Sequence, residues 1–154
     1  MWKKVIPDEH AMLKLGAELA AVCSQQVNIF LLGQLGAGKT TFTRGFLRGL
    51  GFKGHVKSPT YTLVESYSLK AVMVHHFDFY RVRDAQELEF IGIQDYFSPG
   101  TICLIEWPDL GEGFLPQPDI SCAIEVIHDG REINITAHTG VGEKILQRLS
   151  DQDE

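Results

Sequence analysis

The sequence predicts an α/β fold with a mixed sheet and added antiparallel hairpins. Two short apolar runs, Val27–Leu32 and Thr101–Glu106, have the length and composition of central strands that are buried on both faces. Segments with helical spacing of apolar residues alternate with them. The first run leads into Gly33-Gln34-Leu35-Gly36-Ala37-Gly38-Lys39-Thr40, which fits G-x-x-x-x-G-K-[ST]. We therefore expect a P-loop NTPase-like single domain over residues 1–154, in which residues 151–154 form a frayed acidic tail.

The N-terminal third predicts a helix, a strand and a second helix. Pro7-Asp8 is a typical helix start, and apolar residues follow it at helical spacing, namely Met12, Leu15, Leu19 and Val22. The strand Val27–Leu32 comes next. The second helix is expected from about residue 39 to residue 50, where Gly51 ends it.

The middle of the chain predicts a hairpin and a short helix. Residues 61–67 and 72–78 have the pattern of two antiparallel strands joined near Leu69-Lys70. Asp84 and Glu87 form a capping box, which opens a helix through about residue 91. After the strand at 101–106, the prolines and glycines of residues 108–118 predict a loop.

The C-terminal part predicts a second hairpin and a last helix. Apolar and polar residues alternate over 120–126 and again over 133–137, and Asp129-Gly130 is the expected two-residue turn between them. Val141, Ile145 and Leu149 have helical spacing.

The composition is that of an ordinary globular protein, with 44% hydrophobic and 22% charged residues. The apolar run that ends at Leu32 is too short for a signal peptide or a membrane span, so we expect a cytoplasmic protein without membrane association. Cys23, Cys103 and Cys122 have no metal-ligand spacing and lie among apolar residues, which predicts buried free thiols.

The net charge of −6 is unevenly distributed along the chain. Five basic and no acidic residues lie from Lys39 to Lys57, whereas the chain from Asp84 onward holds fifteen acidic and three basic residues. A basic segment beside a phosphate site suits a polyanion or an acidic partner surface, and residues 44–57 are the expected partner face. The acidic remainder argues against tight unaided binding to nucleic acid.

The glycine-rich segment predicts a nucleotide site, with a ligand-free glycine turn as the alternative. Its glycines allow successive backbone N–H groups to turn toward an anion at the positive end of a helix. The Lys39 ammonium can reach the β- and γ-phosphates, and the Thr40 hydroxyl can bind magnesium. We expect ATP and Mg²⁺ as ligands, bound by Gly33, Leu35, Gly36, Ala37, Gly38, Lys39, Thr40 and Thr41.

Two carboxylates end apolar strands and are candidates to complete the site. Glu106 lies at the carboxyl end of its strand, where ligands bind in open α/β sheets, and it occupies the Walker-B position expected to hold magnesium. Asp78 ends the other apolar strand. If that strand runs parallel to Val27–Leu32, Asp78 faces the same crevice and could position or activate the attacking water. A structural salt bridge with Arg81 is the alternative.

The segment Lys57-Ser58-Pro59-Thr60 connects the nucleotide helix to the first hairpin. A Thr in such a loop can sense the γ-phosphate in nucleotide switches, and a plain turn into a strand is the alternative for Thr60. His75 and His76 are adjacent on a strand and point to opposite faces, so they cannot chelate one metal ion together. We expect packing or exposure for both.

Missing motifs narrow the class of P-loop protein. The chain has no Asn-Lys-x-Asp motif for guanine recognition, which disfavours a GTPase. It has no ABC-type signature before a Walker-B strand, which disfavours an ABC-type ATPase. It also has no Arg-rich lid segment of the kind found late in small-molecule kinases.

Five segments in order resemble the bacterial TsaE (YjeE) family. They are the phosphate loop, Val-Lys-Ser-Pro-Thr-Tyr-Thr-Leu-Val-Glu at 56–65, His-Phe-Asp-Phe-Tyr-Arg at 76–81, Glu-Leu-Glu-Phe at 87–90 and Ile-Glu-Trp-Pro at 105–108. The resemblance runs from about residue 7 to residue 108, and the C-terminal hairpin matches more loosely. It implies a weak Mg²⁺-dependent ATPase that works with the TsaB–TsaD pair in forming threonylcarbamoyladenosine next to the anticodon of tRNA. Such a protein drives or resets the transferase, and it reaches tRNA through the complex.

The resemblance also implies roles for individual residues. Lys39 and Thr40 are implied as phosphate and magnesium groups, and Glu106 as a magnesium group. Asp78 and Thr60 belong with Lys39 to the catalytic and switch region. Trp107 follows the magnesium carboxylate and either senses it or packs, while the base and sugar end of the nucleotide is expected near Glu9 and Arg131.

Two other functions remain open from the residues. One is a P-loop small-molecule kinase, which needs a second substrate pocket. The other is a nucleotide-gated binding module with little hydrolysis.

Overall fold

The computed structural model describes residues 1–23 and 26–152. The elements in chain order, with two 3₁₀ helices labelled η, are β1 (Trp2–Ile6), α1 (Glu9–Val22), β2 (Val27–Leu32), α2 (Lys39–Gly49), β3 (Val64–Ser68), β4 (Met73–Asp78), α3 (Glu87–Phe90), η1 (Ile93–Tyr96), β5 (Thr101–Glu106), η2 (Pro108–Gly111), β6 (Ile120–Ile127), β7 (Gly130–Ala137) and α4 (Gly140–Gln152).

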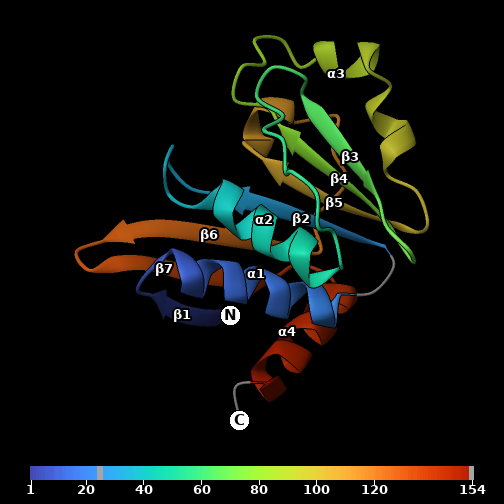
Figure 1. Cartoon of the computed structure of the whole chain (residues 1–154). Helices are drawn as coiled ribbons and strands as arrows, with labels where there is room; N and C mark the ends of the chain where they lie inside the picture. The colour runs from blue at the N-terminus through green and yellow to red at the C-terminus, as the bar shows by residue number, and fades with distance from the viewer. Residues whose placement is uncertain (24–25, 153–154) are drawn as a thin grey trace.

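Seven strands form one mixed sheet in the order β1-β7-β6-β2-β5-β4-β3 (Figure 1). The four strands β6, β2, β5 and β4 run parallel, whereas β3 pairs antiparallel with β4, β7 with β6 and β1 with β7. The predicted α/β fold with a mixed sheet and added hairpins is therefore confirmed. Because β2 lies in the middle, the glycine-rich loop that follows it leaves from the centre of the sheet.

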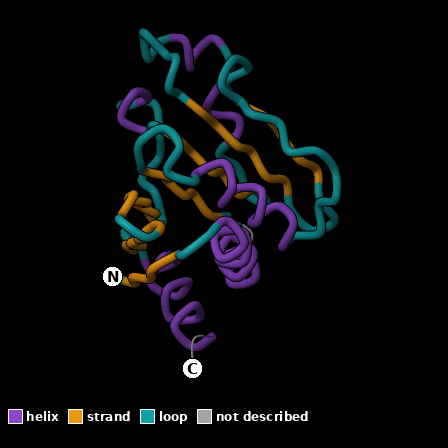
Figure 2. Tube along the Cα trace, turned by 60° about the vertical axis from the view of Figure 1, so that its left-hand side comes forward, coloured by secondary structure: helices purple, strands orange, loops and turns teal. Residues whose placement is uncertain are grey.

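Helices α1 and α2 pack side by side on one face of the sheet, with α4 next to α1 (Figures 1 and 2). Glycines let the two backbones approach closely. A Cβ atom on Gly16 would lie 2.3 Å from the Phe42 carbonyl oxygen, and one on Gly45 would lie 2.2 Å from the Leu13 carbonyl oxygen. This contact fixes α2, and with it the phosphate loop at its N-terminus, against the rest of the core.

The sheet separates two hydrophobic clusters. The larger lies under α1, α2 and α4 and includes Phe42 and Phe46 of α2. The smaller lies on the opposite face, where Phe77 and Ile105 of β4 and β5 pack against segments that include α3 and η1. Successive residues of β4 and β5 therefore alternate between the two clusters, as expected of buried parallel strands.

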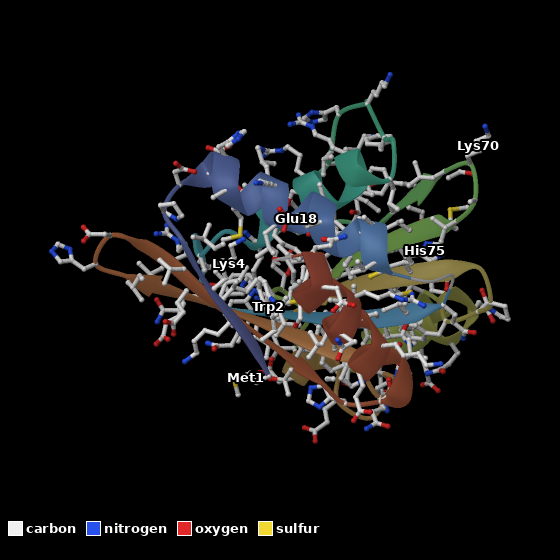
Figure 3. The ribbon with its side chains drawn as sticks, turned by 90° about the horizontal axis from the view of Figure 1, so that it is seen from below. Met1, Trp2, Lys4, Glu18, Lys70 and His75 are labelled. Carbon is white, nitrogen blue, oxygen red and sulfur yellow. The ribbon has the colours of Figure 1, made fainter. Side chains whose placement is uncertain are left out.

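The strand β1 is absent from the sequence prediction. Trp2 and Ile6 point inward, with 8% and 2% of their surface exposed, but Lys4 occupies the inward position between them and Val5 is 55% exposed. The apolar residues of this strand do not alternate, so the sequence carries no strand pattern. Figure 3 shows Trp2 and Lys4 on β1 and Lys70 at the β3–β4 turn, on opposite sides of the molecule.

Several predicted boundaries shift. β3 begins at Val64 rather than residue 61, because Leu63 adopts a left-handed φ of 71° and its N–H donates to the Pro59 carbonyl. The expected helix after Asp84 is the single turn Glu87–Phe90, and the expected loop at 108–118 contains η2. At the other end α4 continues through Gln152, so residues 151 and 152 belong to a helix, while residues 153–154 of the expected tail lie outside the described residues.

The second hairpin turn is shifted by one residue from its predicted place. Ile127 pairs with Gly130, so the two turn residues are His128 and Asp129 rather than Asp129 and Gly130. Gly130 serves a different purpose, because a Cβ atom there would lie 2.4 Å from the Ile6 carbonyl oxygen at the end of β1.

In the described part of the chain, no helix combines the length and the apolar character needed to cross a membrane. All three cysteines are free thiols, and Cys103 and Cys122 are buried as predicted, while Cys23 is half-buried.

Candidate nucleotide site

The phosphate loop leaves β2 at Gly33 and ends where α2 begins at Lys39. Gly33 has a φ of 152°, and a Cβ atom there would lie 2.7 Å from the Ile124 carbonyl oxygen of β6. Gly36 and Gly38 adopt φ values of 79° and 119°, which other residues rarely tolerate. The loop thus has the glycine-dependent geometry that turns backbone N–H groups toward an anion.

A cavity of about 230 Å³ opens at the carboxyl ends of β2, β4 and β5, and we call it the phosphate cavity. Its lining residues are Leu35, Gly36, Gly38, Lys39, Thr40, Thr41, Ser58, Thr60, Asp78, Glu106 and Trp107. The structure therefore brings together the predicted catalytic and metal-binding side chains from four separate segments of the chain.

Lys39 is held in the phosphate cavity with only 5% of its surface exposed. Its ammonium donates to the Gly33 carbonyl and lies 4.2 Å from the centre of the Trp107 ring. Burial lowers the pKa of Lys39, and the nearby Glu106 and Asp78 carboxylates oppose that shift. Trp107 holds its position with a left-handed φ of 55°, so the backbone bends sharply directly after Glu106.

Asp78 sits beside Glu106, because the two residues are register partners on β4 and β5. Its Oδ1 accepts from the Tyr80 N–H at 2.9 Å, and its Oδ2 accepts from the Thr60 hydroxyl at 3.3 Å. Burial raises the pKa of Asp78, and the charge of Glu106 adds to that shift. The alternative ion pair with Arg81 does not occur among the described residues, since Arg81 lies 4.4 Å over the ring of Tyr61.

His76 is a site residue that the sequence reasoning missed. It is completely buried, and its Nε2 donates to Glu106 Oε2 at 2.6 Å. Its Nδ1 has no hydrogen-bond partner among the described residues. The prediction that His75 and His76 point to opposite faces is confirmed, because His75 instead contacts Ser66 and Tyr96. The missed signal was the spacing, since His76 and Asp78 share a face of one strand.

The donor set of the phosphate cavity fits a hard divalent cation. Thr40 and Glu106 line the same cavity, and Glu106 is 96% buried beside a second carboxylate. Oxygen donors of this kind suit Mg²⁺, which keeps part of its coordination shell for water and substrate phosphates. In the described residues no three His, Cys, Asp or Glu side chains gather into a metal cluster.

A second cavity, of about 270 Å³, adjoins the first and we call it the N-terminal cavity. Both cavities are lined by Gly36, Gly38 and Thr41. The N-terminal cavity brings Glu9 and Arg131 together with the apolar side chains of Ile6 and Met12. Glu9 also lies 3.5 Å from Arg44 of α2. The two residues that were expected near the base and sugar are therefore adjacent to the phosphate loop, on its other side.

Comparisons with known proteins agree with this architecture. The sequence profile of the family described as "Threonylcarbamoyl adenosine biosynthesis protein TsaE" matches residues 6–133. The tRNA threonylcarbamoyladenosine biosynthesis protein TsaE of Haemophilus influenzae is 48% identical over 151 residues, which are 95% of this chain and 96% of that protein. The protein of the same name from Bacillus subtilis is 39% identical over 154 residues, which are 99% of this chain and 94% of its own.

A solved structure shows the same fold. The crystal structure of Bacillus subtilis YdiB superposes with a TM-score of 0.82 at 33% sequence identity, over 99% of this chain and 95% of that one. The family profile covers most of the chain and the two relatives match nearly all of it. This chain therefore belongs to the TsaE family.

Proposed function

We propose that this protein binds ATP with Mg²⁺ and hydrolyses it slowly, as a component of the machinery that forms threonylcarbamoyladenosine in tRNA. The names of its relatives support the pathway. One observation supports the chemistry above all others: Lys39, Thr40, Asp78 and Glu106 converge on a single cavity at the N-terminus of α2. A helix N-terminus combined with a buried lysine and two carboxylates suits a magnesium–triphosphate complex.

Lys39 and the loop amides are assigned to the phosphates. In the present structure the Lys39 ammonium is satisfied by a backbone carbonyl and an aromatic face, both of which are weaker partners than a phosphate dianion. Thr40 and Glu106 are assigned to Mg²⁺. When bound, Mg²⁺ neutralises charge that develops on the phosphate oxygens during transfer.

Asp78 is assigned to the attacking water. A general base is most effective when its pKa lies near the working pH, and burial shifts the pKa of Asp78 upward in that direction. The hydrogen bond from Thr60 ties Asp78 to the loop that precedes β3. Thr60 can therefore report the presence of a γ-phosphate to Asp78 within the same cavity.

The base and sugar are assigned to the N-terminal cavity, which adjoins the loop on the side away from Asp78. Its apolar wall at Ile6 and Met12 suits the face of a purine, and Glu9 supplies a carboxylate within the same cavity.

The TsaB–TsaD pair is the proposed partner, and tRNA is reached through that complex. The basic segment at 44–57 leads directly into the loop that carries Ser58 and Thr60, and Arg48, Lys53 and Lys57 are exposed there. A partner that binds this segment would act on the loop whose Thr60 contacts Asp78. This connection supports hydrolysis that is activated in the complex.

The experiment is a measurement of ATP hydrolysis by the protein alone, with TsaB alone, and with TsaB and TsaD together. We expect slow turnover alone, a sharp rise only with both partners, and loss of that rise in Asp78→Asn. An unchanged rate with both partners would refute partner-activated hydrolysis. Phosphate transfer to a metabolite in place of water would instead identify a small-molecule kinase.

A further inference from the structure

Arg131 makes an unusual set of contacts for a residue expected at the base and sugar of a nucleotide. Its guanidinium is half-buried and, among the described residues, donates to backbone carbonyls only. Nε donates to the Ala37 carbonyl at 2.9 Å, and Nη2 donates to the Gly36 carbonyl at 3.3 Å. Nη1 donates to the carbonyl of Gly130, its neighbour in the chain, at 3.0 Å. Two of these three contacts tie β7 to the middle of the phosphate loop, which is 94 residues away in sequence.

These contacts determine which way the loop amides point. A trans peptide unit is planar, and its N–H points opposite to its C=O. Because the Gly36 and Ala37 carbonyls face Arg131, the N–H groups of Ala37 and Gly38 face away from it. The Ala37 N–H closes the loop by donating to the Gln34 carbonyl, and Gly38 lines both cavities of the candidate site.

We propose that Arg131 is a positioning residue that holds the phosphate loop in its anion-binding conformation, rather than a ligand of the base or sugar. This inference rests on the proposed function. Glycines make the loop conformation possible, but they also allow many others, so the peptide planes at Gly36 and Ala37 need an external partner. A guanidinium fork can satisfy two carbonyls at once from one rigid plane.

The position of Arg131 is itself held by the fold. Arg131 pairs with Ile6 of β1 and with Val126 of β6, so its backbone is fixed from both sides. The preceding Gly130 allows the end of β1 to approach within a distance that a Cβ atom would forbid. The C-terminal hairpin thus acts as a rigid support for the loop.

The test compares ATP with inorganic tripolyphosphate, which has phosphates but no base or sugar. Loss of Arg131 lowers the fraction of loops in the binding-competent conformation, and the apparent Kd rises in inverse proportion to that fraction for any ligand that uses the loop. For Arg131→Ala we expect the Kd of both ligands to rise by the same factor, about tenfold, which corresponds to about 1.4 kcal/mol. Calorimetric titration in the presence of Mg²⁺ measures both constants.

Two further variants make the comparison specific. Arg148→Ala is the matched control, because Arg148 donates to the Val22 carbonyl far along the chain from the loop and should change neither Kd. Arg131→Lys keeps the charge but offers one nitrogen where Arg131 uses two on the loop, and we expect it to recover only part of the loss. Thermal unfolding followed by circular dichroism verifies that each variant is folded. If Arg131→Ala does not fold, the two Kd values are compared for Arg131→Lys instead.

Each other outcome overturns the inference. A loss confined to ATP would place Arg131 on the base or sugar, and no loss with either ligand would reduce it to a packing contact. Complete recovery of both Kd values by Arg131→Lys would mean that the charge of Arg131, and not its hydrogen bonds to the loop, supports binding. If the unaltered protein binds neither ligand, the proposed nucleotide function itself fails, and the positioning role fails with it.

Discussion

Replacement of His76 should change the magnesium dependence of the candidate site much more than the stability of the fold. The His76→Leu substitution removes the donor to Glu106 Oε2, a hydrogen bond of 2.6 Å between two buried groups. A hydrogen bond to a charged group contributes about 1.5–3 kcal/mol. The same substitution also removes the buried Nδ1, which lacks a partner among the described residues and costs about 1–3 kcal/mol. The two terms oppose each other, so we expect the free energy of unfolding to change by no more than about 2 kcal/mol in either direction.

The effect on magnesium should be much larger. Without His76, the Glu106 carboxylate is free to rotate away from the cavity or toward Lys39, which is also in its surroundings. Loss of the partner that orients a metal ligand typically costs about 10–100-fold in metal affinity or activity. We therefore expect the Mg²⁺ concentration for half-maximal ATP hydrolysis to rise by about that factor in His76→Leu. His76→Gln, which can still donate to Glu106, should recover part of the loss.

The matched control is the adjacent histidine. His75 is also nearly buried and also makes a short hydrogen bond, to the Ser66 hydroxyl at 2.7 Å, but it lies on the opposite face of β4. His75→Leu should leave the Mg²⁺ dependence unchanged. Urea unfolding measures the stability of each variant, and hydrolysis at saturating ATP over a Mg²⁺ series measures the metal dependence. Equal Mg²⁺ dependence in His76→Leu and the unaltered protein would refute the positioning of Glu106 by His76.

Three other predictions follow from the same structure. Asp78→Asn should lower hydrolysis by about 10²–10⁴-fold while ATP still binds, as measured by turnover and by titration, and retained turnover would remove Asp78 from the chemistry. Gly45→Ala should lower the free energy of unfolding by about 1–3 kcal/mol, because its Cβ would lie 2.2 Å from the Leu13 carbonyl oxygen. Gly140→Ala, at an open position of α4, is its control and should not destabilise the fold. Burial raises the pKa of Cys103 to about 12, so at pH 8 only about one Cys103 thiol in 10⁴ is in the reactive thiolate form. Aromatic disulfide reagents should therefore label Cys103 of the folded protein slowly up to pH 8 and label it rapidly in urea, as followed by mass spectrometry of its peptide, and fast labelling of Cys103 in the folded protein would contradict its burial.

The sequence predicts best what short segments determine by themselves. The phosphate loop follows from its own glycines, and the strands β2 and β5 follow from uninterrupted apolar runs. The placement of Asp78 needed one additional assumption, that β4 runs parallel to β2, and the sheet confirms it. Because parallel strands bring their carboxyl ends to one edge of a sheet, that single fact places Asp78 next to Glu106.

The sequence predicts poorly what depends on contacts between distant segments. The spacing from Asp78 places His76 on the same face of its strand, but it does not identify the partner Glu106, which is 30 residues away. The sequence also does not predict the strand β1, since Lys4 and Val5 reverse the alternation of apolar and polar residues expected of a strand. The Asp129-Gly130 pattern predicts a turn position for Gly130, whereas in the structure Gly130 allows the close approach of the end of β1.

The two added hairpins explain why a P-loop alone does not make this site. The β3–β4 hairpin supplies Asp78, and its Leu63 carbonyl accepts from the Asp78 N–H while Thr60 contacts the carboxylate. The β6–β7 hairpin supplies Arg131 to the opposite side of the loop. β1 then joins the second hairpin to the start of α1, which brings Glu9 into the N-terminal cavity. The β6–β7 hairpin therefore holds the phosphate loop through Arg131, and the β3–β4 hairpin places Asp78 in the phosphate cavity on the other side of that loop.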